Sequence, residues 1–212
     1  MLEFSPYFEQ TLKRLRAMLE AAMDMETEKP RIPPNQSVTD RFPVLHAGVI
    51  PRFDVKTWDF IVEGLVQKPM RLVYSEFLSL TRTTSVSDFH CVTGWSRLDN
   101  RWEGVAFKTL CDIVKPLDRA KYVTVICDGS YTTSLPLTDL LDDDVLLAYK
   151  LDDRELPSEH GGPLRLVVPK KYAYKSAKWV RKLRFTEEKE LGFWETRGYS
   201  DSANPWKEER YA

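Results

Sequence analysis

Short runs of β-branched and aromatic residues, separated by turn residues, dominate the chain from residue 58 onward. Four of these runs are typical of β-strands: 58–62, 122–127, 145–149 and 164–168. Between them, segments 75–80, 107–114 and 139–141 favour short helices. The alternation is too irregular for a doubly wound parallel sheet, and no Gly-x-Gly-x-x-Gly motif is present. We therefore predict an α+β domain built on a mixed sheet.

The N-terminal part of the chain has a different texture. Apolar residues recur there at spacings of four and three, which predicts one face of an amphipathic helix over about residues 6–24: Phe8, Leu12, Leu15, Leu19 and Ala22. Residues 26–40 contain three prolines and little apolar content, which favours an extended connector. We predict an N-terminal helical arm and connector over 1–39, a main domain over 40–190, and a tail over 191–212 packed on that domain.

The cysteines and the N-terminus constrain the compartment. Cys91, Cys111 and Cys127 are an odd number without Cys-x-x-Cys spacing, which opposes a disulfide framework or a zinc site and favours a reducing environment. The N-terminus carries no secretory pattern, and no segment is long and apolar enough to span a bilayer. We expect a cytoplasmic protein without direct membrane insertion.

Charge is balanced in total but uneven along the chain. The 31 basic and 32 acidic side chains give a net charge of -1, which opposes nucleic-acid binding by bulk charge. Residues 139–155 carry seven acids and two bases, whereas residues 165–184 carry eight bases and no acid. A solvated basic face is one explanation of the second run. The bases alternate with small and aromatic residues after Pro169, however, and this favours a phosphorylated small molecule over a polyanion.

Cys91 lies in a polar, glycine-containing loop, Asp88–Arg97 in the printed sequence. Such a cysteine is a nucleophile, a metal ligand or a buried core residue. The neighbouring His90 points to the opposite face of an extended chain, so a Cys–His dyad is disfavoured. A lone soft thiolate suits a metal whose other ligands come from a cofactor. These residues alone leave the three alternatives open.

Five segments, in order, make the chain resemble a known family: 41–48, 91–96, 144–149, 156–169 and 175–179. Together they resemble the molybdopterin-binding domain of the sulfite oxidase family, and especially its standalone bacterial members. The resemblance covers residues 40–186. It implies a sulfite oxidase-type molybdopterin-binding fold and a cofactor of molybdenum bound to molybdopterin.

The resemblance also implies roles for individual residues. Cys91 matches the cysteine whose thiolate ligates molybdenum, beside the two dithiolene sulfurs of the pterin. Cofactor contacts are implied at Phe42, Leu45, His46, Cys127, His160, Arg165, Lys175, Ser176, Ala177 and Lys178. The segment Ser176–Lys178, which matches the site of the cofactor phosphate, lies within the basic run. From the residues alone, Cys127 equally fits a strand-end core position, and Lys175 equally fits an exposed surface.

The implied activity is oxygen-atom transfer to or from a small-molecule substrate by an oxidoreductase. Tyr131 resembles the tyrosine that faces the metal, where its phenol donates a hydrogen bond. A family arginine near the substrate oxyanion is replaced by Ser96, which makes a neutral, sulfoxide-like substrate comparable with sulfite. No haem domain is recognisable, so we expect a separate electron-transfer partner or a diffusible carrier. The alternatives are a non-redox binding module for a phosphorylated ligand and a thiol enzyme with Cys91 as nucleophile.

Overall fold

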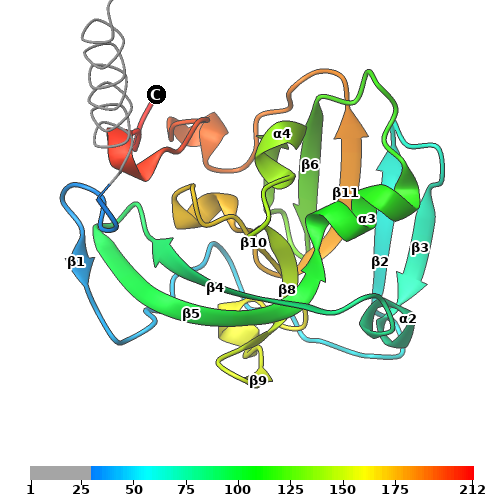
Figure 1. The fold of residues 1–212 in the computed structure, drawn as a ribbon, viewed down its shortest axis with the longest axis horizontal. Coiled ribbons are helices and arrows are strands. Elements are labelled where there is room, and N and C mark those ends of the chain that lie inside the picture. The colour runs from blue at the N-terminus through cyan, green and yellow to red at the C-terminus, as the bar shows by residue number, and fades with distance from the viewer. Residues whose placement is uncertain (1–29) are drawn as a thin grey trace, which may run out of the picture. The chain divides into compact units, whose positions relative to one another are not determined.

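The computed structural model describes residues 30–212, and residues 34–212 form one compact unit built on two mixed sheets (Figure 1). The first sheet has the order β1-β5-β8-β10, with β4 paired to β5 and β9 paired to β8. Its strands are β1 (Ser37–Val38), β4 (Thr83–His90), β5 (Trp95–Ala106), β8 (Leu146–Leu151), β9 (Arg154–Glu155) and β10 (Arg165–Val167).

The second sheet has the order β3-β2-β11-β6-β7. Its strands are β2 (Asp59–Gly64), β3 (Met70–Val73), β6 (Tyr122–Cys127), β7 (Thr132–Pro136) and β11 (Val180–Thr186). The pairs β1–β5 and β11–β2 are parallel and the other pairs are antiparallel, so both sheets are mixed. The predicted α+β class and mixed sheet are therefore confirmed.

The helices of the described residues are short. They are α2 (Tyr74–Leu78), α3 (Phe107–Val114) and α4 (Leu137–Leu140), with 3-10 turns η1 (Ser158–His160), η2 (Ala173–Lys175), η3 (Glu195–Arg197) and η4 (Pro205–Lys207). In α3, Phe107, Leu110, Cys111 and Val114 are buried, a spacing that places them on one face. This face joins a core that both sheets share, and Figure 1 shows α3 crossing in front of the second sheet.

A second, smaller core supports the first sheet. It contains Phe89, Trp102, Leu146, Ala148, Leu151, Leu156 and Val167, with Phe42 and Trp95 packed against it. The Phe42 ring packs edge to face on Phe89, Trp95 and Trp102 at 5.2–6.2 Å between centroids, and the Phe89 ring lies 6.2 Å from Trp95 and 6.0 Å from Trp102. This cluster anchors both the chain before residue 46 and the strand that leads into Cys91.

The elements differ from the sequence expectation in several places, since strands β3, β7, β9 and β11 were not predicted. Ser37 and Val38, inside the predicted connector, pair with Trp95 and Ser96 of β5, so the folded unit begins before residue 40. The long β4–β5 pair was not predicted, because its residues are mostly polar and lack an apolar run. The predicted helix over 6–24 lies outside the described residues.

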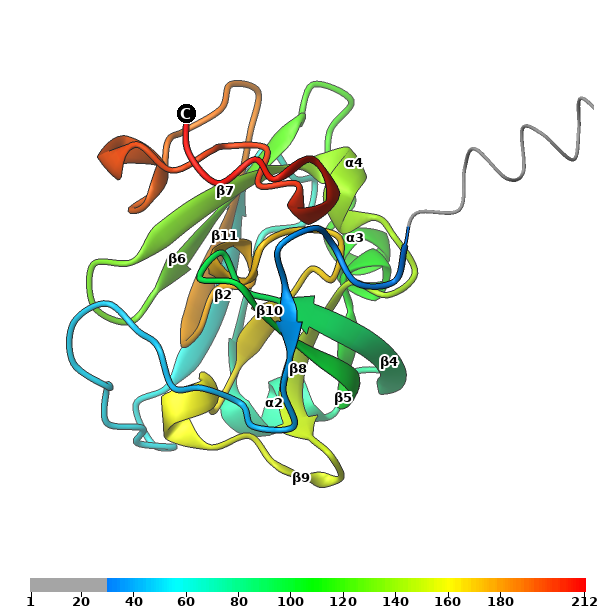
Figure 2. The same cartoon turned by 90° about the vertical axis from the view of Figure 1, so that its left-hand side faces the viewer.

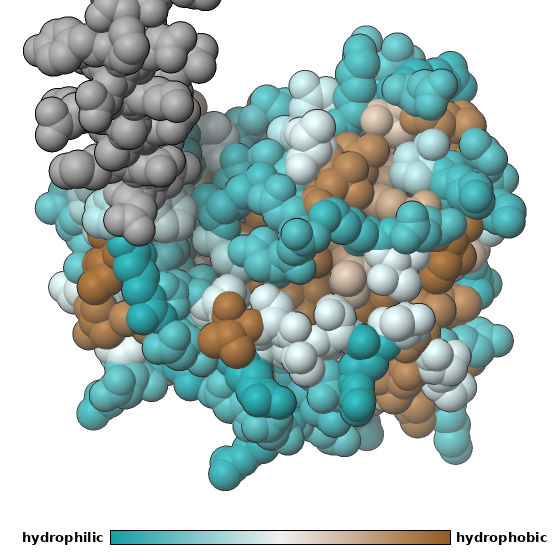
Figure 3. Space-filling view, viewed as in Figure 1, coloured by the Kyte–Doolittle hydropathy of each residue, from teal (hydrophilic) through white to brown (hydrophobic). Residues whose placement is uncertain are grey.

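The surface of the described unit mixes polar and apolar residues. In Figure 3, apolar residues lie between polar ones, most of them toward the side on which α3 lies in Figure 1. None of the helices within residues 30–212 is long and apolar enough to cross a membrane. Figure 2 shows that the C-terminal tail, in red, lies at the same end of the unit as β7.

Candidate functional site

A cavity of about 340 Å³ opens where four parts of the chain meet. They are the loop that contains residues 42–47, the turn after β4, the segment 173–179, and two aromatic residues of the tail. Tyr131 and Arg165 complete the lining, and no aspartate or glutamate is part of it. The cavity is therefore aromatic and cationic.

Cys91 lies in this cavity on a tight turn between β4 and β5. The Cys91 amide donates to the Trp95 carbonyl at 2.8 Å, and the Gly94 amide donates to the Cys91 carbonyl at 3.0 Å. Gly94 has φ 93°, in the left-handed region that favours glycine. The Cys91 Sγ lies 3.2 Å from Thr93 Oγ1, and the residue is only 6% exposed. The turn thus presents one shielded thiol to the cavity.

A buried polar network holds the Cys91 turn from behind. Gln36 Nε2 donates to the Cys91 carbonyl at 3.2 Å, and Ser96 Oγ donates to Gln36 Oε1 at 3.3 Å. Ser96 Oγ also lies 2.8 Å from His90 Nδ1. Ser96, the residue that replaces the expected arginine, is fully buried in this network and is not part of the cavity lining.

The eight bases of residues 165–184 divide into two groups. Six of them form ion pairs with carboxylates: Lys170, Lys171, Lys175, Arg181, Lys182 and Arg184. Lys170 and Lys171 pair with Asp139, so the acidic and basic runs neutralise each other in part. Within residues 30–212, Arg165 and Lys178 form no such pair, and both line the cavity.

Arg165 is buried in β10 beneath the cavity. Its Nη1 donates to the His160 carbonyl at 2.8 Å and its Nη2 donates to the Ser176 carbonyl at 3.0 Å. Its Cζ lies 4.9 Å from the ring centroid of Phe89. Burial lowers the pKa of Arg165 to about 9, because a desolvated cation lacks a counter-ion there. A bound anion would supply that counter-ion.

Lys178 is the second cation without a carboxylate partner. Its Nζ donates to the Leu45 carbonyl at 2.9 Å and to the Glu159 carbonyl at 2.5 Å. Burial, together with the nearby charge of Arg165, lowers the pKa of Lys178 to about 8. Two neighbouring cations in an acid-free cavity indicate an anion-binding site.

His160 lies on a turn that packs directly against both cations. Gly161 follows it with φ 109°, and a Cβ there would approach Arg165 Cβ and Lys178 Cβ at 3.0 Å, so only glycine fits. The His160 ring stacks on Phe42 at 4.5 Å between centroids, and its Nδ1 is buried without a hydrogen-bond partner. Burial and the two cations lower the pKa of His160, which keeps the imidazole neutral near pH 7. The ring itself lies outside the cavity lining, behind Phe42, which is part of that lining.

The structure brings together most of the residues predicted from the sequence. Nine of them line the one cavity: Phe42, Leu45, His46, Cys91, Tyr131, Arg165, Ser176, Ala177 and Lys178. His46 Nδ1 lies 3.0 Å from the Gly48 carbonyl. The Tyr131 hydroxyl donates to the Tyr174 carbonyl, and burial raises the pKa of Tyr131 well above its usual value. Its phenol is therefore protonated.

Like His160, Cys127 and Lys175 lie outside the cavity lining. Cys127 belongs to the shared hydrophobic core, and burial raises the pKa of its thiol. Lys175 is 1% exposed, so the exposed surface position considered for it is wrong. Its ammonium forms an ion pair with Glu195 and is thus neutralised within the protein. The predicted cofactor contacts of these two residues stay predictions.

Several cavity residues were not predicted. Thr93 lies two residues after Cys91, Trp179 follows Lys178, and the aromatic side chains of Tyr174, Trp194 and Tyr199 form one wall. The sequence signal for the last two is the unusual aromatic content of residues 193–199, but a pattern alone does not show what such a segment covers. Trp179 is fixed by Nε1, which donates to the Ser158 carbonyl at 2.7 Å.

Known proteins resemble the chain in sequence and fold. Residues 46–194 match the model of the oxidoreductase molybdopterin binding domain. The uncharacterized oxidoreductase YuiH of Bacillus subtilis is 46% identical over 185 residues, which cover 85% of this chain and 92% of YuiH. The protein-methionine-sulfoxide reductase catalytic subunit MsrP of Campylobacter jejuni is 29% identical, over 68% of this chain and 54% of MsrP.

A solved structure, the sulfane dehydrogenase SoxCD of Paracoccus pantotrophus, shares the fold with a TM-score of 0.60 and 23% identity, over 66% of this chain and 40% of that chain. The chain therefore spans about half or less of these last two relatives.

The family model and the relative YuiH show that the chain is an oxidoreductase that binds molybdopterin, as predicted. The chain belongs to the sulfite oxidase family of molybdopterin-binding oxidoreductases, and its cofactor is molybdenum with molybdopterin. The family membership favours an enzyme over a non-redox binding module.

The cavity fits this cofactor on its own chemistry. Within residues 30–212, no group of three or more His, Cys, Asp or Glu side chains could hold a metal, so a metal at Cys91 needs ligands from outside the protein. A dithiolene supplies such ligands. Arg165 and Lys178, which line the cavity and have no carboxylate partner within residues 30–212, provide charge for a phosphate.

Proposed function

We propose that the protein transfers an oxygen atom to or from a small substrate at a molybdenum centre ligated by Cys91. One observation carries the proposal: the shielded Cys91 thiol lines the same cavity as the two cations that lack carboxylate partners. When bound, the cofactor supplies the two-electron chemistry. The side chains of this protein bind it, orient it and exclude water around it.

Three residues have distinct binding roles in this proposal. Arg165 and Lys178 neutralise the cofactor phosphate, and their lowered pKa values rise when that anion binds. The predicted cofactor contact of His160 is kept in this proposal through its ring, which stacks on the cavity residue Phe42. Leu45, whose carbonyl accepts from Lys178, ties the loop at residues 42–47 to the same cation and so closes one side of the cavity.

The proposed substrate is a neutral sulfoxide. Its reduction consumes two electrons and two protons and releases a thioether and water, so the oxygen atom and the charge balance. With Arg165 and Lys178 assigned to the phosphate, His46 is the one remaining basic side chain in the lining, and Ser96 is buried elsewhere. An oxyanion such as sulfite would lack a strong counter-ion. The sulfoxide reductase relative MsrP is consistent with this choice.

Electrons are proposed to come from a separate protein or a diffusible carrier, and the proposed location is the cytoplasm.

Tyr131 is proposed to hold a proton in the cavity: burial keeps its phenol protonated, and the Tyr174 carbonyl accepts that proton in a hydrogen bond. The hydroxyl oxygen of Tyr131 is then free to accept a bond from a bound molecule.

The proposal predicts different losses for Cys91→Ser and Arg165→Met. We expect Cys91→Ser to abolish sulfoxide turnover with an artificial electron donor but to retain the pterin, because both cations remain. We expect Arg165→Met to lose bound pterin, since a phosphate ligand is gone. Molybdenum and pterin are measured in freshly purified protein, together with turnover.

Cys111→Ser is the matched control for this experiment. Cys111 is also a buried cysteine, but it lies on α3 in the core. It should keep both cofactor and turnover. Wild-type turnover in Cys91→Ser, or wild-type protein that never carries molybdenum or pterin, would refute the proposal.

A further inference from the structure

The tail, residues 191–212, supplies part of the cavity lining. It leaves the edge of the second sheet at Phe193, whose amide donates to the Thr132 carbonyl at 2.8 Å. The Tyr199 ring then lies 4.8 Å from Trp194 and 5.5 Å from Tyr174 between centroids, and all three rings line the cavity. We call these three rings the aromatic wall. Tyr199 lies beyond residues 46–194, the part that matches the family model.

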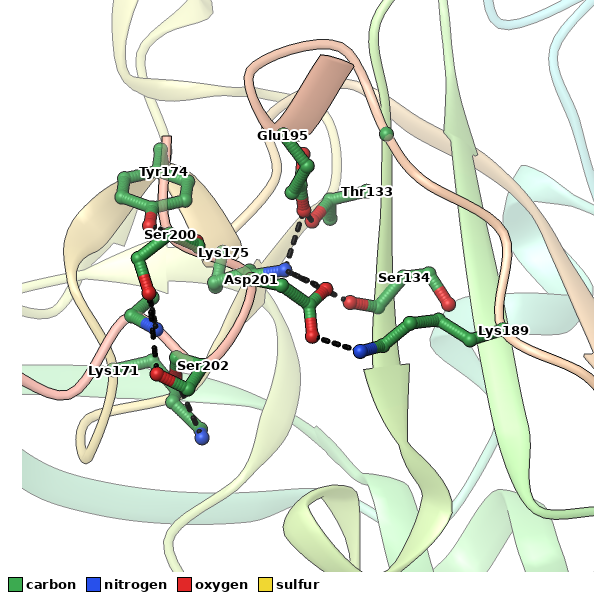
Figure 4. Close-up of polar contacts among 12 residues, drawn as sticks. Thr133, Ser134, Lys171, Tyr174, Lys175, Lys189, Glu195, Ser200, Asp201 and Ser202 are labelled. Atoms are coloured by element: carbon green, nitrogen blue, oxygen red, sulfur yellow. Dashed lines mark hydrogen bonds and ion pairs between the residues drawn. The ribbon is translucent and has the colours of Figure 1, made fainter. Parts of the chain in front are cut away.

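A buried ionic network holds the aromatic wall in place (Figure 4). Lys175 follows Tyr174 and Glu195 follows Trp194, so their ion pair joins two of the three rings through the backbone. Lys175 Nζ also donates to the Ser134 carbonyl at 3.0 Å. Thr133 Oγ1 donates to Glu195 at 2.7 Å. Because burying two charges is costly without such contacts, the network fixes one position of the tail.

A second set of contacts joins the tail to the turn that carries Cys91. Arg210 Nη1 donates to the Val92 carbonyl, and the Trp206 ring lies 5.2 Å from His90 between centroids. Asn35 Nδ2 donates to Glu208 at 2.7 Å. The tail therefore contributes two rings of the aromatic wall and also contacts the turn that carries Cys91. These contacts fix the position of the wall relative to Cys91.

The wall is apolar on the cavity side. The Tyr174 hydroxyl donates to the Ser200 carbonyl, and the tail contributes no charged side chain to the lining. Aromatic faces bind apolar and aromatic groups, and aromatic pairs gain more than their burial alone provides. An oxyanion gains nothing from such a surface.

We propose that Trp194 and Tyr199 are specificity-determining residues that bind an apolar arm, aryl or branched alkyl, on the substrate. This inference rests on the proposed function, since it places that arm next to the reacting sulfoxide. Lys175 and Glu195 are positioning residues. The wall thus makes the enzyme prefer sulfoxides with a large apolar arm over small sulfoxides and over oxyanions.

The test compares methyl phenyl sulfoxide with dimethyl sulfoxide on the molybdenum-loaded enzyme. We expect Trp194→Leu and Tyr199→Leu each to lower the ratio of kcat/KM for the aryl over the small substrate by about tenfold, the factor for 1.4 kcal/mol. The loss should fall on KM for the aryl substrate. Tyr199→Phe should keep the ratio, because the ring and not the hydroxyl binds.

Phe53→Leu is the matched control, since Phe53 is an aromatic residue that is 39% exposed, lies outside the lining and packs on Tyr74 at 5.1 Å between ring centroids. It should leave the ratio unchanged. Equal losses on both substrates in the two leucine variants would overturn the inference, as would loss of bound pterin, which would make the wall a cofactor contact.

Binding of methyl phenyl sulfone, an unreactive analogue, separates this inference from the proposed function. Its dissociation constant is measured by quenching of tryptophan fluorescence, and we expect it to rise about tenfold in Tyr199→Leu. If the sulfone bound in a way that depends on Tyr199 but the protein showed no sulfoxide turnover, the proposed reaction would be refuted. The role of the aromatic wall in binding an apolar arm would stand. Binding that is absent or independent of Tyr199 would refute the wall.

Discussion

At the scale of single residues, the site is defined by which charges lack a partner. Most bases of the basic run are neutralised by carboxylates, and Lys170 and Lys171 take theirs from the acidic run. Arg165 and Lys178 are the exceptions, and burial makes their charged forms unfavourable. The folded protein therefore keeps two buried cations that have no carboxylate counter-ion. Their desolvation lowers the stability of the fold until an anion binds.

Lys178 makes anion binding depend on pH in a predictable window. Because the pKa of Lys178 is about 8, its ammonium is mostly charged at pH 7 and mostly neutral above pH 8. We expect inorganic pyrophosphate to bind cofactor-free protein more weakly as pH rises from 7 to 8.5. Isothermal titration calorimetry measures this, and Lys178→Met should remove most of the change. Undiminished wild-type affinity at pH 8.5 would contradict the role of Lys178.

The lowered pKa of Lys178 also makes the stability of the cofactor-free protein depend on pH. Anion binding weakens as pH rises, whereas stability increases. The unfolded chain binds a proton at Lys178 up to about 10.5, whereas the folded, cofactor-free protein loses it near 8. Between these values the unfolded state binds more protons, so the contribution of Lys178 makes the free energy of unfolding rise with pH. Below pH 8 both states are protonated, and the contribution does not change.

At the scale of secondary-structure elements, the close approach of the paired strands β5 and β8 requires a glycine in β5. A Cβ at Gly104 would lie 2.1 Å from the Leu147 carbonyl oxygen and 2.7 Å from Ala148 Cα. The register of the pair shifts between Glu103 and Gly104, where the strands approach. The backbone of β8 cannot yield without moving Leu147, which is fully buried in the shared core.

We expect Gly104→Ala to lower the free energy of unfolding by about 1–3 kcal/mol, because it overpacks two backbones. Gly129→Ala is the control: Gly129 has φ 79° and no atom within 4 Å of an added Cβ. Its cost should be about 1 kcal/mol, from the left-handed backbone alone. Urea denaturation measures both. A smaller loss for Gly104→Ala than for Gly129→Ala would contradict the close approach.

Elements with an apolar run could be predicted from the sequence, and elements without one could not. Strand β6 and helix α3 have the predicted bounds, because apolar residues dominate the strand and one helical face. Strand β11 was hidden by its bases, which alternate with Leu183 and Phe185 and pair with acids of β2. Strand β4 is polar over most of its length, and only its partner β5 makes it a strand.

The site divides in the same way. Arg165 and the segment around Lys178 could be found from charge, small residues and the family resemblance, which are all local in sequence. The neutralisation of Lys175 by Glu195 could not, because it joins residues twenty positions apart. The aromatic wall was missed for the same reason: its rings come together only when the tail packs on β7.

At the scale of the whole molecule, the tail unites the parts of the described unit. It pairs Glu195 with Lys175 of η2, hydrogen-bonds to Thr132 of β7 and contacts the turn after β4. These contacts link both sheets to the cavity. The tail is therefore expected to unfold with the unit in a single transition and not before it.

The buried pair Lys175–Glu195 provides the test of this linkage. Both side chains are 1% exposed, so Lys175→Met leaves an uncompensated carboxylate in the interior. We expect a loss of about 3–5 kcal/mol in the free energy of unfolding, and a single transition at a lower Tm by circular dichroism. Lys175→Met with Glu195→Leu should recover most of the loss, because replacing both charges with apolar groups is close to neutral.

Lys182→Met serves as the matched control, since the Lys182–Glu63 pair is partly exposed and such pairs contribute about 0–1 kcal/mol. If Lys175→Met instead produced two separate transitions, the tail would be an independent unit, and Lys175 would not connect it to the sheets. If the double variant were as unstable as Lys175→Met, the loss would come from packing and not from charge. A double variant that recovers its stability but has lost the preference for the aryl sulfoxide would separate stability from positioning, because the fold would tolerate an apolar pair while the aromatic wall requires the ionic one.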